Sequence, residues 1–67
     1  MMYTDGTYSY MLVFSARHDW CIYKLACEGP KERNEKECLT LFRHKMRFYA
    51  EEELERLAVA GGWQKTA

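Results

Sequence analysis

The sequence has few of the features that mark exported or membrane-embedded proteins. Residues 1–6 contain no basic segment leading into an apolar run, and no stretch approaches the roughly 20 apolar residues of a membrane span. The three cysteines, Cys21, Cys27 and Cys38, are an odd number, which favours reduced thiols over a disulfide framework. We therefore expect a cytoplasmic protein that does not contact a membrane.

The chain also lacks an excess of charge and a glycine-rich loop. Ten Lys and Arg residues balance ten Asp and Glu residues, so the whole protein has no net attraction to a nucleic-acid backbone. The four glycines are isolated or form the pair Gly61 and Gly62, which excludes a phosphate-binding loop. A nucleophilic site needs a cleft beside the core, for which 67 residues leave little volume. We therefore expect that the protein is not an enzyme, has no catalytic residue and binds no cofactor.

Apolar and aromatic residues are abundant. Hydrophobic residues make up 48% of the chain, including five Tyr, three Phe and two Trp, which is more than a disordered segment carries. A chain of 67 residues has room for one core, so residues 1–67 are expected to form a single small domain. A core of this size is marginal unless disulfides, a metal or a partner support it.

Two segments have the pattern of β-strands. Residues 8–16 alternate between two faces, and residues 20–27 are rich in aromatic and β-branched side chains. The polar residues 17–19 separate them, which predicts an antiparallel hairpin that Gly29 and Pro30 end. One face of the first strand carries Tyr8, Tyr10, Leu12, Phe14 and Ala16.

The sequence after the hairpin favours helix. Asn34 and Glu37 resemble a capping box, and the apolar residues that follow recur at three- and four-residue spacings. Gly61 and Gly62 are expected to end the helical region with a left-handed cap, with Trp63 folded back onto the last turn. The apolar positions are Cys38, Leu41, Phe42, Met46, Tyr49, Ala50, Leu54 and Leu57.

The predicted fold is therefore α+β, a small antiparallel β-hairpin followed by one long helix or two short ones. Helix is preferred after about Glu35 because the segment holds good helix formers and one β-branched residue, Thr40. An alternative stays open, since residues 38–48 also alternate. It has a third strand there and a C-terminal helix that starts at the acidic residues 51–53.

The candidate metal ligands are His18, Cys21, Cys27, Cys38 and His44, because thiolate and imidazole bind zinc. Cys21 and Cys27, six residues apart on a strand, lie roughly 20 Å from each other. Cys38 and His44 would point to nearly opposite sides of a helix. His18, Cys21 and Cys38 remain, one ligand short of a closed structural site. We expect no metal and small buried thiols, with a zinc-stabilised module as an alternative.

The excess of aromatic residues on the hairpin suggests the function. If helices cover one face, the other face and the strand edges still present apolar and tyrosine side chains to water. We expect a non-enzymatic protein that binds another protein, or a second copy of itself, and inhibits or adapts it. Phages and mobile elements often encode accessory proteins of this kind. The expected partner-binding residues are Tyr8, Tyr10, Trp20, Tyr23, Arg43, Lys45 and Arg47.

The basic run at residues 43–47 supports a different hypothesis, nucleic-acid binding. On a helix its cations could contact phosphates or enter a major groove. Arg47 and Glu51 have the spacing of an ion pair on a helix, however, and the acidic residues 51–55 would repel the same phosphates. Nucleic-acid binding through a basic helix at residues 43–47 is therefore the alternative to protein binding.

Overall fold

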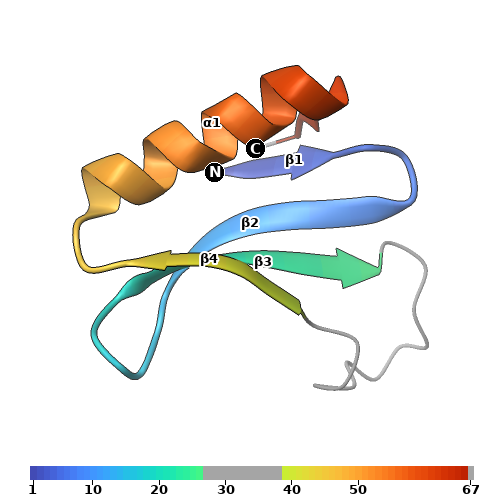
Figure 1. The fold of residues 1–67 in the computed structure, drawn as a ribbon. Helices are drawn as coiled ribbons and strands as arrows, with labels where there is room; N and C mark the ends of the chain where they lie inside the picture. Colours follow the sequence, from blue (N-terminus) through green and yellow to red (C-terminus); the bar gives the residue numbers. More distant parts are fainter. Residues whose placement is uncertain (27–38, 67) are drawn as a thin grey trace.

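The computed structural model describes residues 1–26 and 39–66, which form a five-stranded β-sheet with one helix packed on one face (Figure 1). The elements are β1 (Met2–Thr4), β2 (Tyr8–Phe14), β3 (Trp20–Ala26), β4 (Leu39–His44), α1 (Arg47–Gly61) and β5 (Gln64–Lys65). The strand order is β4-β3-β2-β1-β5, and every neighbouring pair is antiparallel. The predicted α+β class is confirmed, although the sheet is larger than a hairpin.

The predicted hairpin is present as strands β2 and β3. They pair along their whole length, from Tyr8 opposite Ala26 to Phe14 opposite Trp20. The turn between them is closed by two backbone hydrogen bonds of 2.8 and 3.0 Å, and His18 in this turn adopts a left-handed conformation with φ 61°. The polar residues that the sequence assigns to the turn are therefore where the chain reverses.

Two short strands that the sequence analysis did not predict extend the sheet. Strand β1 pairs with β2, and β5 returns from the helix to pair with β1. Asp5 organises the turn between β1 and β2, because its Oδ1 accepts the N–H of Thr7 at 2.8 Å and the N–H of Tyr8 at 2.7 Å. Gly6 allows the tight reversal there by adopting φ 97°.

The helix predicted to begin near Glu35 is wrong for residues 39–44, which form β4. Pairing with β3 satisfies the backbone of this segment and packs Phe42 against the core, and these gains outweigh its helical propensity. The alternative with a third strand at residues 38–48 and a C-terminal helix is right in kind. The strand is shorter than that range because α1 already begins at Arg47.

The start of α1 also differs from the alternative that placed it at residues 51–53. Its first turn contains no acidic residue. His44 Nδ1 accepts the Met46 N–H at 2.9 Å, which closes the turn just before Arg47. Several residues used in the sequence-based predictions lie outside the described residues, namely Cys27, Gly29, Pro30, Asn34, Glu37 and Cys38.

The end of α1 agrees with the prediction. Gly62 adopts a left-handed conformation with φ 67°, and the Trp63 N–H donates to the Ala58 carbonyl at 2.8 Å. The indole of Trp63 then folds back so closely that a Cβ on Gly61 would lie 2.9 Å from two of its ring atoms. This return brings the C-terminal segment to β1, so both ends of the chain lie together in Figure 1.

The core lies between α1 and one face of the sheet. Ala50, Leu54 and Ala58 are buried at successive four-residue steps along α1, and Leu54 forms the core cluster with Tyr10 and Ile22 of the sheet. Partly buried hydrophobic residues surround this centre, namely Met1, Tyr3, Leu12, Phe42, Leu57 and Trp63. Within the described part of the chain, no helix has the length and apolar character needed to cross a membrane.

Candidate binding surfaces

The sheet face opposite α1, which we call the open face, is covered by no element of the described residues (Figure 1). Because side chains alternate along a strand, the neighbours of the buried Tyr10 and Ile22 point to this face. Strand pairing aligns Met2, Met11 and Tyr23 in one row across three strands. The apolar residues of the open face, all half-buried, are Met2, Met11, Val13, Tyr23 and Leu25.

Polar side chains border this apolar centre. Thr4 lies opposite Ser9 on one side and Gln64 on the other. On the β4 side, Thr40 lies opposite Tyr23. Interfaces between proteins commonly have this arrangement of an apolar centre and a polar border.

One corner of the open face is held by Asp19. Its carboxylate accepts hydrogen bonds from the Ser15 hydroxyl, from Cys21 Sγ at 3.3 Å and from Arg43 Nη1 at 3.2 Å. These donors, Ser15 first, lower the pKa of Asp19, although partial desolvation opposes the shift. The Cys21 side chain is fully buried beneath this cluster, and burial together with the Asp19 hydrogen bond raises the pKa of its thiol. Cys21 is therefore a structural thiol and not an activated nucleophile.

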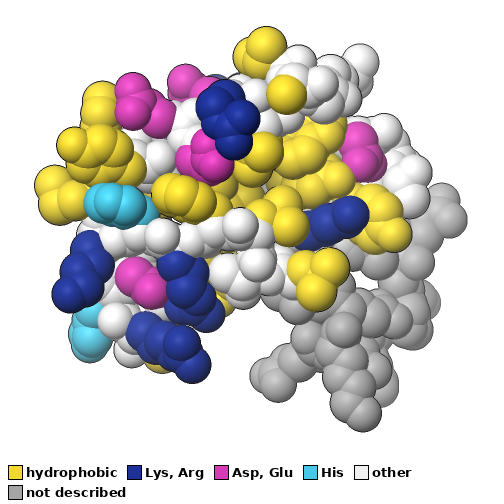
Figure 2. Space-filling view, viewed as in Figure 1, with side chains coloured by type: hydrophobic (Ala, Val, Ile, Leu, Met, Phe, Trp, Pro, Cys, Tyr) yellow, Lys and Arg dark blue, Asp and Glu magenta, His cyan; other side chains and the backbone are white. Residues whose placement is uncertain are grey.

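Two turns that are distant in sequence lie side by side at one end of the sheet. Register partners join Cys21 to Arg43 and Trp20 to His44, so the β2–β3 turn lies beside the turn from β4 into α1. Figure 2 shows Lys, Arg and His side chains gathered at this end, next to hydrophobic ones. We call this surface the basic end, and its cationic and titratable members are Arg17, His18, Arg43, His44, Lys45 and Arg47.

Aromatic rings pack at both turns of the basic end. Phe14 contacts His18 at a ring-centroid distance of 6.0 Å and Trp20 at 5.0 Å. His44 is the register partner of Trp20 on the next strand, and its ring lies 4.7 Å from that of Tyr49. Phe48 continues the series, 5.6 Å from Tyr49. Phe14, Phe48 and Tyr49 are 51%, 60% and 51% exposed, which is unusual for such large rings.

The structure brings four of the seven predicted partner-binding residues together, since Trp20, Arg43, Lys45 and Arg47 all belong to the basic end. The three basic residues are not on one helix as predicted. Arg43 lies in β4, Lys45 in the following turn and Arg47 at the first position of α1, because β4 replaces the expected helix. The guanidinium of Arg47 lies 5.1 Å from the Trp20 ring centre and forms the predicted ion pair with Glu51, at 2.6 Å.

The other three predicted residues are dispersed. Tyr23 lies on the open face, as described above. Tyr8 lies at the opposite end of the sheet, where the ammonium of Lys24 sits 4.0 Å from its ring centre. Tyr10 is 4% exposed and belongs to the core, so it offers no surface to a partner.

No family model, curated protein or solved structure matches this chain. A functional conclusion therefore has to come from its own surfaces. The described residues do not support the alternative hypothesis of a zinc-stabilised module. Among them, no three His, Cys, Asp or Glu side chains are grouped so that they could hold a metal ion. Cys21 is engaged with Asp19 and His18 with the Phe14 ring, whereas Cys38 lies outside the described residues.

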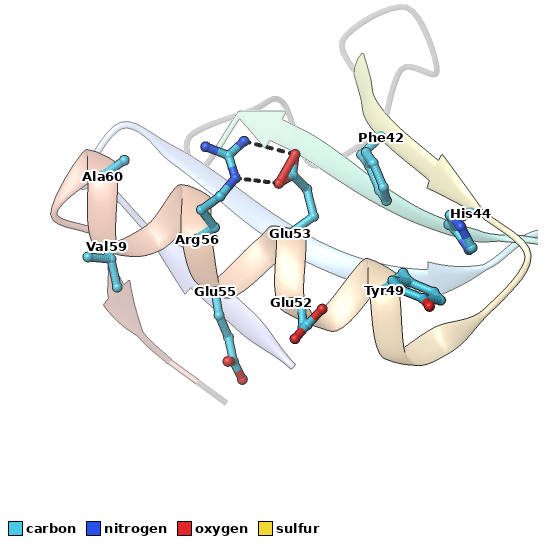
Figure 3. A pocket seen from close by; sticks show the side chains of 9 residues that line it. All are labelled: Phe42, His44, Tyr49, Glu52, Glu53, Glu55, Arg56, Val59 and Ala60. Carbon is cyan, nitrogen blue, oxygen red and sulfur yellow. Dashed lines mark hydrogen bonds and ion pairs between the residues drawn. The ribbon is translucent and has the colours of Figure 1, made fainter.

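An open groove of about 840 Å³ runs between α1 and β4 (Figure 3). Phe42, His44 and Tyr49 line the end near β4, and glutamates project from the helix. The Arg56 guanidinium donates to Glu53 at 2.6 and 2.9 Å, and this hydrogen bonding lowers the pKa of Glu53. A carboxylate neutralised in this way is suited to a surface ion pair and not to proton transfer.

Sequence reasoning missed Phe14, Arg17 and Phe48 as surface residues of the basic end. Arg17 is the only Lys or Arg of its turn, and only the pairing of β3 with β4 brings this turn beside the turn that contains Lys45. The alternating pattern at residues 38–48 was the signal for this surface, because a third strand paired with the hairpin would end beside the β2–β3 turn.

Proposed function

We propose that this protein is a non-enzymatic binding module that docks its open face onto another protein or onto a second copy of itself. The observation that supports the proposal is the row of Met2, Met11 and Tyr23 across the sheet centre, on a face that no described element covers. Tyrosine is a frequent interface anchor, and methionine adapts its shape to a partner surface.

The size of the domain supports the same conclusion. One helix supplies Ala50, Leu54 and Ala58 to one side of the sheet, and the described residues supply no second layer. A small domain gains stability when a partner covers its remaining apolar surface. The partner would thereby be blocked or adapted, which is how a small accessory protein of a phage or mobile element acts. The reduced, buried thiol of Cys21 suits a cytoplasmic setting.

The open face can be tested by a double substitution, Met11→Thr with Leu25→Thr, because threonine suits a strand but removes the apolar contact. The matched control is Val59→Thr on α1, where the side chain is 85% exposed. We expect the native protein and the control to form a discrete complex in sedimentation experiments, alone or with a partner cross-linked in the source cell. The double variant should lose the complex while its urea unfolding midpoint changes little.

The proposal fails if the native protein sediments as a monomer at high concentration and no discrete partner is cross-linked. It also fails if the double variant retains the complex, because the docking surface would then lie elsewhere. Cross-linked peptides that map to β1, β2 and β3 of the native complex would support the assignment.

A further inference from the structure

We propose that the basic end binds single-stranded nucleic acid, with bases stacked on its exposed rings and phosphates held by its cations. This inference is independent of the docking proposal, because the rings concerned lie at the end of the sheet and not in the apolar centre of the open face. It also differs from insertion of a basic helix into a major groove, since residues 43–47 form a strand end, a turn and the first residue of α1.

The exposed aromatic rings of the basic end offer surfaces on which bases can stack. Phe14, Phe48 and Tyr49 are each more than half exposed, yet each ring packs against another, Phe14 on Trp20 and Tyr49 on both His44 and Phe48. Trp20 and His44 are register partners on β3 and β4, so the two groups of rings lie on adjacent strands. Rings fixed in this way lose little conformational freedom when a base stacks on them. Stacking platforms of this kind tolerate any base, because every base presents a π face.

The Lys and Arg side chains of the basic end offer binding sites for phosphates. Arg43 and Arg47 are paired with Asp19 and Glu51, whereas Arg17 and Lys45 form no ion pair with any described residue. These two therefore remain available to phosphates, and the first turn of α1 holds no acidic side chain to repel them. On the face that Figure 2 shows, most acidic side chains lie toward α1, and one lies among the basic side chains.

The dimensions favour a short single strand over a duplex. Phe14, Trp20 and His44 lie in register on β2, β3 and β4, which together span roughly 10 Å, and Phe48 and Tyr49 follow in the first turn of α1. A surface of this size suits a few nucleotides. Single-strand binding sites of this kind combine a cationic track with stacked bases. With about three phosphates contacted, log K should fall with log salt concentration with a slope of about −2.

The test measures binding of a fluorescein-labelled oligothymidylate by anisotropy across a salt series. Arg17→Gln with Lys45→Gln removes the two unpaired cations, and Phe14→Ala removes one exposed ring. The matched control, Lys24→Gln with Lys65→Gln, changes the net charge equally at positions outside the basic end. We expect a loss of affinity of about tenfold in the double variant, a smaller loss with Phe14→Ala and little change in the control.

Several outcomes would overturn the inference. Equal losses in the two double variants would show that only overall charge matters. A duplex of the same length that competes as well as the single strand would exclude base stacking. Tighter binding of poly-glutamate than of oligothymidylate would assign the surface to an acidic protein. Retained secondary structure, checked by circular dichroism, is required of every variant compared.

Discussion

The Tyr10 ring stacks face to face on the Trp63 indole, with centroids 3.5 Å apart and an interplanar angle of 8°. The hydroxyl of Tyr10 also donates to Asp5 Oδ2 at 2.6 Å. One residue of β2 therefore ties the β1–β2 turn to the segment that follows α1. The Thr66 N–H donates to the Met2 carbonyl at 2.9 Å and fastens the same region. The two ends of the chain are thus held together by side chains as well as by β5.

Replacing Trp63 should test the importance of this stack for stability. We expect Trp63→Ala to lower the free energy of unfolding by about 2–4 kcal/mol, because a large ring contact and an aromatic pair are lost. Trp63→Phe keeps a stacking partner and should cost clearly less. Urea unfolding followed by circular dichroism measures both. Equal stability of Trp63→Ala and the native protein would show that the C-terminal segment is not part of the folded core.

Gly61→Ala should destabilise the native protein although alanine has the better helix propensity. A Cβ there would meet the Trp63 indole, with two ring atoms at 2.9 Å, and the ring cannot move without leaving Tyr10. We expect a loss of about 1 kcal/mol.

The same substitution should change sign in the Trp63→Ala background. With the indole absent, Gly61→Ala should stabilise the variant by about 0.5–1 kcal/mol, the normal gain from replacing glycine in a helix. A double-mutant cycle from urea unfolding gives the coupling. Independent effects of the two substitutions would contradict the close contact.

The acid stability of the protein should depend on Asp5 and Asp19. The Tyr10 hydroxyl and the N–H groups of Tyr8 and Thr7 lower the pKa of Asp5, and the Ser15 hydroxyl is the main cause of the lowered pKa of Asp19. A carboxyl whose folded pKa is depressed binds fewer protons folded than unfolded. Its contribution is therefore complete above the unfolded pKa of about 3.9 and is lost as pH falls through the folded pKa.

We accordingly expect the urea midpoint to drop as pH falls below about 4. Asp5→Asn and Asp19→Asn should each lower the midpoint at neutral pH and make the acid decline shallower. Glu52→Gln, at an exposed position of α1, serves as a control that should leave the profile unchanged. A native profile that stays flat to about pH 2 would contradict the assigned hydrogen bonds.

Cys21 should resist thiol reagents in the folded protein. Its side chain is fully buried, and burial raises the pKa of its thiol, so both access and the thiolate fraction are low. In a Cys27→Ser, Cys38→Ser background, labelling of Cys21 should require opening of the fold and accelerate sharply in urea. If Cys21 is labelled at the rate of a free thiol without denaturant, Asp19 and Arg43 do not shield it from reagent in solution, which would contradict its burial.

The sequence by itself determined the elements whose signals are local. Alternation over residues 8–14 sufficed for β2, polar residues sufficed for the turn around His18, and Gly62 with Trp63 sufficed for the helix end. In each case the neighbouring residues alone carry the preference, through side-chain periodicity or through the left-handed conformation that glycine accepts. The α+β class followed from the same signals.

Tertiary structure decided what local preference left open. Residues 39–44 fit either a helix or a strand, and only the pairing with β3 and the burial of Phe42 select the strand. Strands of two or three residues, as in β1 and β5, are too short to show a period and form because partners are present. Non-local packing also buried Tyr10 in the core, and strand pairing brought the turn that contains Arg17 beside the turn that contains Lys45. These energies arise between distant segments, so the linear pattern does not contain them.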